Sequence, residues 1–451
     1  MKKIEQYRNT IRITAITLFC LLSTIVYFVF WDVYYNRSFD NQYVDKGRLF
    51  IIVVYFCVLF VTSLIVGLFR VDELRRGEII FYGTIAVVFS NAIAYAQVCL
   101  IKAVIAPIDG MMFAFIVQVL LLVSWTFFSS TIVHALNPPE NLVIVYGSHL
   151  ATEVVYKMST MEDKYVITES INVDEGYEAI VQKVDRFDGV VICDVPARLR
   201  NDLLKYCYQQ NKNVYVIPKI SDIIIRSASD ITYFDSPIMR CRSNGLTVEQ
   251  RAVKRLMDIV ISLFGIIISS PIMLFVALAI KLYDRGPVFY KQKRCTKDLK
   301  TFDILKFRSM VVDAEKNGPQ PATDNDKRIT PVGKVIRSFR LDELPQLINI
   351  LKGEMSFVGP RPERIEHVAE YSEEIPEFVN RYKVKGGLTG YAQVFGKYNT
   401  SAYNKLKMDL IYIQNYSLFL DFKLILMTVK ILFKKESTEG FSVSTKNKDK
   451  G

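Results

Sequence analysis

The sequence predicts a membrane protein of mixed architecture: a four-helix transmembrane domain, a Rossmann-like α/β domain, and a second α/β domain with a re-entrant membrane helix-hairpin. The 451 residues are 51% hydrophobic, with a mean hydropathy of +0.20, yet 23% of them are charged. Such a chain is too apolar for an ordinary soluble enzyme and too charged for a pure transporter. In addition, four apolar stretches fill the first third, and short β-branched runs follow them.

Charge and cysteine usage narrow the classes of partner. The net charge of +11 and a pI near 9.1 favour anionic partners, such as phosphorylated substrates and the headgroups of a membrane. Nucleic acid would need further signals, and we expect none as a partner. The seven cysteines are scattered without a paired C-x-x-C spacing, so neither a disulfide framework nor a zinc site is indicated.

The four apolar stretches of residues 1–136 are each near the ~20 residues that cross a bilayer. They lie at about 11–31, 49–69, 79–105 and 111–135. Basic residues precede the first stretch and separate the second from the third, which places both ends of this domain in the cytoplasm. A cleaved signal peptide is the alternative for the first stretch, but a small-residue cleavage site is missing and the apolar core is long.

Residues 140–245 are predicted to form a Rossmann-like (CoA-binding-like) accessory domain. The runs 142–146, 190–193 and 214–217 are β-branched and alternate with amphipathic segments, as in a parallel sheet. Gly147 follows the first run, but one glycine is far short of G-x-G-x-x-G, so a phosphate-binding loop is doubtful. Tyr208 and Lys212 have the Tyr-x-x-x-Lys spacing of short-chain dehydrogenases, and coincidence is the better explanation.

The apolar segment 256–282 is either a fifth crossing helix or a re-entrant hairpin. Ser270-Pro271 lies at its middle, where proline removes a backbone donor and kinks or breaks a helix. Basic residues crowd both flanks, which puts both ends in the cytoplasm. We therefore expect re-entry rather than crossing, with Ser270 supplying a partner for backbone groups freed at the break.

Asp342 and Glu343 are the strongest candidates for chemistry. They stand just before Leu344-Pro345, and proline favours the first turn of a helix that would run from Gln346 and stop at Gly353. A helix N-terminus favours an ionised carboxylate, the form a nucleophile needs, and also attracts phosphate oxygens. Acidic residues are also common there for stability alone, and from these residues by themselves the two explanations are even.

Basic residues nearby are candidates for phosphate contacts. Arg361 stands between two prolines after Gly359, a stiff turn that could fix a guanidinium against phosphate, or merely expose it to solvent. Lys306 and Arg308 alternate along an expected strand, so both would point to one side, toward phosphate or toward solvent. The glycines at 386, 387 and 390 could bring amides to an anion, although turn formation is their commoner use.

The order of several motifs resembles one known family. GPVFYKQKR at 286–294, FDILKFRSM at 302–310, RLDELPQLINILKGEMSFVGPRP at 340–362, GGLTGYAQV at 386–394 and DFK at 421–423 follow the Ser-Pro hydrophobic segment. Together they look like the bacterial sugar transferase family, the polyprenyl-phosphate phosphoglycosyl transferases with a single membrane hairpin. The match covers about 250–435, and the four helices with a Rossmann-like domain resemble the long form that starts capsule and exopolysaccharide synthesis.

That resemblance implies roles for individual residues. Asp342 corresponds to the nucleophilic aspartate, and Glu343 to its partner, placed at the metal and assisting proton transfer. Lys306, Arg361 and Asp421 match positions important for activity. The chain departs from the pattern with Lys397 in place of Arg, Gly386 in place of Pro and Cys295 in place of Gly. Lysine keeps the charge at 397 but loses bidentate donation, so its phosphate-binding role is the least secure.

The resemblance further implies a reaction and a location. A sugar 1-phosphate would pass from a UDP-sugar to a polyprenyl phosphate, releasing UMP, through a covalent intermediate on Asp342, with Mg²⁺ at Asp342 and Glu343. The protein would be multi-pass in a bacterial cytoplasmic membrane, with the catalytic domain 250–435 facing the cytoplasm, and homodimerisation would fit. The segment 403–433 mixes lysines with apolar residues, as a helix lying on an anionic membrane or an amphipathic core helix would. The tail 436–451 is polar.

Two rivals remain at this point. A nucleotide-sugar dehydratase or reductase would need a glycine-rich dinucleotide loop, which the sequence lacks. The other rival is a non-catalytic membrane scaffold or sensor, and the Asp342-Glu343 pair with Arg361 argues against it.

Overall fold

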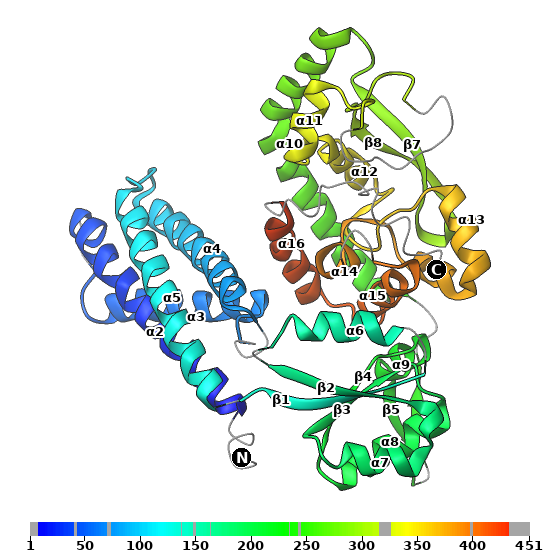
Figure 1. Ribbon diagram of the computed structural model, residues 1–451. Helices are drawn as coiled ribbons and strands as arrows, with labels where there is room; N and C mark the ends of the chain where they lie inside the picture. The colour runs from blue at the N-terminus through cyan, green and yellow to red at the C-terminus, as the bar shows by residue number, and fades with distance from the viewer. Residues whose placement is uncertain are drawn as a thin grey trace. The chain divides into compact units, whose positions relative to one another are not determined.

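The computed structural model divides the chain into two compact units, Met1–Lys219 and Ile220–Gly451 (Figure 1). It describes residues 8–39, 43–69, 74–136, 138–147, 150–162, 164–233, 235–241, 245–314, 326–396 and 400–432. The predicted site residue Lys397 and the predicted tail 436–451 lie outside the described residues.

The first third forms long apolar helices, as the hydropathy pattern predicts. They are α2 (Arg8–Tyr34), α3 (Lys46–Val66), α4 (Arg76–Lys102) and α5 (Asp109–Leu136), with the short 3-10 turn η1 (Asn36–Ser38) after α2. All four are long and apolar enough to cross a membrane, and so is a fifth helix, α10. A buried polar ring joins three of them: Tyr55 donates to Asn91 at 2.7 Å, Asn91 to Gln118 at 2.8 Å, and Gln118 back to the Tyr55 hydroxyl at 2.8 Å. Hydrogen bonds of this kind stabilise helix association inside a bilayer.

A parallel four-stranded sheet follows, which confirms the predicted α/β domain. Its strands run in the order β2-β1-β3-β4, and every pair is parallel. They are β1 (Glu140–Tyr146), β2 (Tyr165–Asn172), β3 (Gly189–Cys193) and β4 (Asn213–Val216), connected by α6 (Leu150–Ser159), η2 (Val173–Glu175), α7 (Tyr177–Val184) and α8 (Ala197–Gln209). The central strands β1 and β3 are buried on both faces, because apolar clusters cover each side.

Two details of this region bear on the sequence predictions. Tyr208 is 86% exposed, whereas the Lys212 ammonium donates to the carbonyls of Val184, Asp185 and Phe187 at 3.1, 2.9 and 2.7 Å, so the pair does not form a joint site. The structure divides the chain into its two units after Lys219, whereas the predicted domain boundary lies near residue 245. Ile220 and Ile223 on α9 (Ile220–Arg226) pack into the core of the second unit, and the hairpin β5 (Ser229–Tyr233) and β6 (Ser236–Arg240) follows them.

Helix α10 (Val248–Asp284) opens the larger part of the second unit and corrects the predicted break. Thr247 and Gln250 form a capping box at its start. The helix then continues through Pro271 to Asp284, so Ser270-Pro271 does not separate two helices. Pro271 has no N–H for the Ile267 carbonyl, and the Ser270 hydroxyl donates to that carbonyl instead at 2.8 Å, as predicted.

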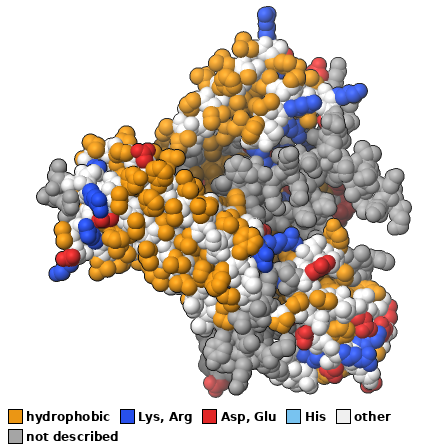
Figure 2. All heavy atoms as spheres, turned by 60° about the vertical axis from the view of Figure 1, so that its left-hand side comes forward, with side chains coloured by type: hydrophobic (Ala, Val, Ile, Leu, Met, Phe, Trp, Pro, Cys, Tyr) orange, Lys and Arg blue, Asp and Glu red, His pale blue; other side chains and the backbone are white. Residues whose placement is uncertain are grey.

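Most of α10 is an exposed apolar surface. Only 11% of its most apolar window is buried within the protein, and Figure 2 shows hydrophobic side chains gathered over this helix and over the four-helix part. The buried stripe contacts the rest of the unit: Val276 and Ile280 pack on Phe307 and Ile336, and Ile266 packs on Leu347. An exposed apolar face of this length marks contact with lipid rather than water.

The remaining elements surround two small sheets. The antiparallel hairpin is β7 (Phe289–Cys295) and β8 (Thr301–Phe307), joined by η3 (Lys297–Leu299), and the parallel pair is β9 (Ser356–Val358) and β10 (Gly387–Thr389). The helical elements are α11 (Pro331–Ser338), η4 (Leu341–Glu343), α12 (Gln346–Lys352), α13 (Ile365–Glu374), η5 (Pro376–Lys383), α14 (Tyr391–Phe395), α15 (Ala402–Gln414) and α16 (Leu418–Leu432). Leu406 and Leu410 of α15 and Leu424 of α16 are buried in the core, so the membrane-surface prediction for 403–433 gives way to the core-helix alternative in the described part.

Candidate active site

Asp342 and Glu343 lie on a tight turn between two helices. They form the 3-10 turn η4, which Arg340 enters with a left-handed φ of 53°, and Glu343 N–H donates to the Arg340 carbonyl at 3.2 Å. The helix predicted after Pro345 is present as α12, and Gly353 ends it in the left-handed conformation with φ 87°. The acidic pair therefore precedes α12 on a turn of its own.

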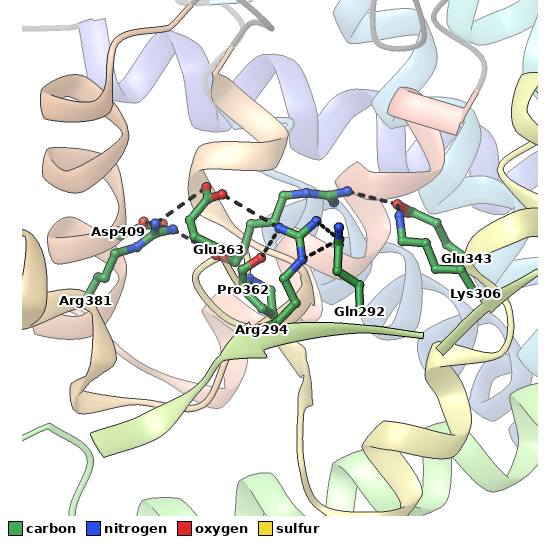
Figure 3. Close-up of polar contacts among 9 residues, drawn as sticks. Gln292, Arg294, Lys306, Glu343, Pro362, Glu363, Arg381 and Asp409 are labelled. Atoms are coloured by element: carbon green, nitrogen blue, oxygen red, sulfur yellow. Dashed lines mark hydrogen bonds and ion pairs between the residues drawn. The ribbon is translucent and has the colours of Figure 1, made fainter. Parts of the chain in front are cut away.

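Glu343 is surrounded by cations. Its Oε1 accepts from Lys306 Nζ at 3.0 Å and from Arg361 Nη2 at 2.9 Å, and Arg340 Nη1 lies 3.8 Å from Oε2. Figure 3 shows the Lys306 and Glu343 side chains meeting at this point. Burial raises the pKa of Glu343, but the charges of Lys306, Arg361 and Arg340 outweigh it and hold the pKa well below its usual range. Glu343 is therefore an ionised carboxylate at neutral pH.

Asp342 has a different environment from its neighbour. Its side chain is half-buried, and no hydrogen bond or ion pair to its carboxylate is found within the described ranges. Burial raises the pKa of Asp342; the Lys306 charge opposes this, and the Glu343 charge adds to it, so that the pKa stays above its usual value. Asp342 is thus an accessible carboxylate with unused lone pairs, beside a fixed cluster of positive charge.

Arg361 is positioned by close backbone packing, as its stiff turn predicts. Gly359 N–H donates to the Thr389 carbonyl at 2.8 Å, and Gly387 N–H donates to the Pro360 carbonyl at 2.9 Å. A Cβ at Gly387 or Gly390 would lie only 2.1 Å from backbone atoms of Gly359. These two glycines are therefore required for close backbone contact with Gly359, a use different from the anion binding and the turn formation considered for them.

A chain of charges that the sequence did not reveal supports the Arg361 loop. Arg381 donates to the Arg361 carbonyl at 3.0 Å and pairs with the buried Asp409 at 2.8 Å. Glu363 lies 3.6 Å from Arg381 and 3.9 Å from Arg294, and Arg294 also donates to the Pro362 carbonyl at 3.1 Å and to Gln292 (Figure 3). Glu363 follows Arg361 closely enough to have been noticed, but no local pattern marks Arg381 or Asp409.

Arg308 and Asp421 are not brought to this site. Arg308 is 7% exposed, pairs with Asp284 at the end of α10 (Nη1 to Oδ2, 2.7 Å), and donates to the Pro287 carbonyl at 2.7 Å. Asp421 is fully buried and accepts from Lys254 at 2.6 Å and from the Tyr412 hydroxyl at 2.8 Å. Both residues hold elements together: Arg308 fastens β8 to α10, and Asp421 fastens α16 to α10 and α15. Lys306 and Arg308 therefore have different partners in the structure, and the phosphate contact of Arg308 stays a prediction.

The arrangement has the features needed to attack an electrophile that carries negative charge. The Asp342 carboxylate is free to form a bond, and Lys306, Arg340 and Arg361 place three positive charges around its neighbour Glu343. Within the described residues, no group of three or more His, Cys, Asp or Glu side chains forms a metal cage. Two adjacent carboxylates nevertheless suit Mg²⁺, which usually takes one or two carboxylates and fills its other positions with water and substrate phosphate.

Comparison with known proteins identifies the family. The bacterial sugar transferase family matches residues 249–435. Over 183 residues the chain is 44% identical to a UDP-N-acetylgalactosamine-undecaprenyl-phosphate N-acetylgalactosaminephosphotransferase of Aeromonas hydrophila, covering 40% of this chain and 43% of that protein. It is 38% identical over 247 residues to a UDP-glucose:undecaprenyl-phosphate glucose-1-phosphate transferase of Klebsiella pneumoniae, covering 54% and 51% of the two chains.

These alignments span only about half the length of the two enzymes. A third relative is covered almost completely. An uncharacterized sugar transferase of Bacillus subtilis is 36% identical over 187 residues, which are 42% of this chain and 90% of that protein. The matched region contains α10, the acidic pair and the Arg361 loop. The chain therefore belongs to the bacterial sugar transferase family.

Proposed function

We propose that the protein transfers a sugar 1-phosphate from a UDP-sugar to undecaprenyl phosphate, releasing UMP, as an early membrane step of exopolysaccharide or capsule synthesis. The observation that supports it most is the half-buried carboxylate of Asp342, which accepts no hydrogen bond among the described residues and lies next to the cation cluster at Glu343. The names of two relatives contain the same donor and acceptor classes.

The reaction proceeds in two displacements. An Asp342 oxygen attacks the phosphorus bonded to the sugar, the phosphoanhydride bond breaks, and UMP leaves with the bonding electrons. A phosphate oxygen of the lipid then attacks the same phosphorus, and the bond to Asp342 breaks, which regenerates the carboxylate. Lys306 and Arg361, fixed by Glu343, stabilise the negative charge that develops on the phosphoryl oxygens.

Asp342 and Glu343 would hold Mg²⁺ together with the donor diphosphate. The metal would offset the negative charge of the diphosphate and of the leaving UMP. In addition to this shared role, Asp342 forms the bond to phosphorus, and Glu343 orients Lys306 and Arg361.

The exposed apolar face of α10 places this chemistry at a membrane. We propose that α10 bends at Pro271, and so enters and leaves the cytoplasmic leaflet of a bacterial cytoplasmic membrane. Basic residues stand at both ends of its apolar segment, with Lys254 and Arg255 in its first turns and Lys281 and Arg285 at its end. A site at headgroup depth would meet a water-soluble donor and a lipid whose phosphate lies at the same level.

The first experiment measures UMP release by the purified full chain from a panel of UDP-sugars, with undecaprenyl phosphate and Mg²⁺ present. One UDP-sugar should yield UMP and a lipid-linked sugar in equal amounts. If no member of the panel yields UMP from folded protein, the scaffold or sensor function becomes the better proposal.

Arg361→Gln should lower kcat/KM by about 10²-fold or more, because a charge-assisted bond to the reacting phosphate is worth about 2.7–4 kcal/mol. Arg361→Lys keeps the positive charge but loses the two parallel hydrogen bonds of a guanidinium, so we expect it to recover only part of the lost kcat/KM. Steady-state UMP release measures both variants. Equal rates for Arg361→Gln and the wild type would exclude a phosphate contact.

Lys306→Gln should move the acidic side of the pH profile to higher pH. Lys306 lowers the pKa of Asp342, so its removal raises that pKa further. Because the ionised carboxylate is the nucleophile, activity falls as pH falls through the pKa of Asp342. In the variant this fall would begin at a higher pH. The pH dependence of kcat/KM tests the shift, and exposed Lys334→Gln is the matched control. An unmoved profile would show that Lys306 does not set the Asp342 pKa.

A further inference from the structure

A second basic site lies on the β7–β8 hairpin. The strands pair with Lys291 opposite Leu305 and Lys293 opposite Asp303, and side chains alternate between faces along a strand. These four residues therefore share one face. Gln292 and Arg294 belong to the opposite face, together with Lys306, which is paired with Tyr290. One face of the hairpin thus carries Lys306 of the Glu343 site, and the other face carries Lys291 and Lys293 away from that site.

That second face lines a pocket of about 690 Å³. We call it the lysine pocket, because six lysines and only three carboxylates contribute to its lining. The lysines are Lys291, Lys293, Lys297, Lys300, Lys352 and Lys385, and the carboxylates are Asp298, Asp303 and Glu354. None of the site residues at Asp342, Glu343 or Arg361 lines it.

The positive charge of the pocket is only partly neutralised. Lys293 pairs with Asp303 and Lys297 with Asp298, each at 3.3 Å. Among the described residues, Lys291, Lys300, Lys352 and Lys385 form no ion pair, and Glu354 is the only carboxylate of the lining left to balance them, so the lining carries three more positive than negative charges. Mutual repulsion of this kind is relieved when an anion binds.

Lys385 is the most informative of these lysines. It is half-buried, and burial lowers its pKa, with the charge of Arg255 lowering it further. Arg255 is fixed by bonds to the carbonyls of Ile350 and Leu351 at 2.7 Å, and its guanidinium lies against Gly353 at the pocket edge. A partly buried ammonium near other cations lowers the stability of the fold, but it can bind phosphate well.

The pocket also adjoins the start of the apolar face of α10. Arg255 is followed by Leu256, which is 64% exposed. A basic side chain at the pocket edge is thus next in sequence to the first residue of the exposed apolar face. A phosphate at headgroup depth could reach this side of the hairpin, and so could a soluble phosphorylated compound.

We propose that the lysine pocket binds a phosphate-bearing anion through Lys291, Lys352 and Lys385, as a second anion site on the opposite face of the hairpin from Asp342. The shared chemistry is phosphate, from either an anionic lipid headgroup or a soluble phosphorylated compound. The inference is independent of the sugar-transfer reaction.

The test is equilibrium binding of pyrophosphate to the full chain in nanodiscs of phosphatidylcholine. Lys291→Gln combined with Lys352→Gln should weaken pyrophosphate binding in the lysine pocket by about 10²-fold or more, because two charge-assisted bonds to the anion are lost. Arg361→Gln should instead weaken pyrophosphate binding at the Glu343 site. The matched control, Lys327→Gln with Lys334→Gln, removes the same charge from exposed positions outside the pocket.

Lys291→Arg with Lys352→Arg should retain binding and thereby exclude a folding defect. Nanodiscs that contain phosphatidylglycerol separate the two sources: a headgroup in the pocket would compete and weaken pyrophosphate binding in the wild type, whereas a soluble ligand would leave it unchanged. Equal pyrophosphate binding by the wild type and the double glutamine variant would overturn the proposal.

Discussion

Asp342→Asn should abolish UMP release, lowering kcat by roughly 10⁴-fold or more, because an amide oxygen cannot form the covalent intermediate. The Asp342 carboxylate has no part in holding the fold, since no hydrogen bond to it is found among the residues described. The loss should therefore come without a loss of folding.

The covalent step can be measured directly. Wild-type protein given a UDP-sugar without lipid acceptor should release one UMP per chain and gain the mass of the phosphosugar. The matched control is Asp313→Asn, which makes the same change at an exposed carboxylate of the same unit. Full UMP release by Asp342→Asn, with the control also active, would contradict the proposed nucleophile and leave direct attack by the lipid phosphate.

Sequence patterns predicted the parts of the site that depend on local chain geometry. Pro345 and Gly353 mark the start and end of α12, and the structure confirms both. The prolines and glycines around Arg361 predicted a fixed loop, and the backbone bonds between Gly359 and Thr389 provide it. Local signals of this kind depend on residues within one or two turns, which a sequence displays directly.

The partners of the site residues could not be predicted in the same way. Lys306, near the end of β8, and Arg308, just after β8, are two positions apart, yet Lys306 binds Glu343 on the acidic turn and Arg308 binds Asp284 at the end of α10. Arg381 and Asp409 are 28 positions apart, and only the fold brings them together. Ion pairs between distant segments leave no periodic trace in a sequence.

Asp421 shows how a residue can match an activity-linked position without reaching the substrate. It lies fully buried at the start of α16, bonded to Lys254 on α10 and to Tyr412 on α15. The Tyr412 hydroxyl oxygen also lies 3.3 Å from the Val358 carbonyl oxygen, in the strand that leads to the Arg361 loop. We infer that Asp421 supports activity by holding this scaffold.

Lys254→Met should accordingly destabilise the second unit by about 3–5 kcal/mol, because it leaves the Asp421 carboxylate buried without its cation. At ~2–4 °C per kcal/mol for a domain of this size, thermal unfolding of the detergent-solubilised chain should begin about 10 °C lower. Burial already raises the pKa of Asp421, and Lys254 opposes this, so the variant raises that pKa further. A folded-state pKa above the unfolded one means that stability is lost as pH rises, so the stability lost by Lys254→Met should become smaller at acidic pH.

Lys254→Met combined with Asp421→Leu removes both charges and should recover part of the lost stability, whereas exposed Lys334→Met should change the stability little. An unfolding temperature equal to that of the wild type would show that the pair contributes nothing, and the activity of Asp421 variants would then need a direct explanation at the site.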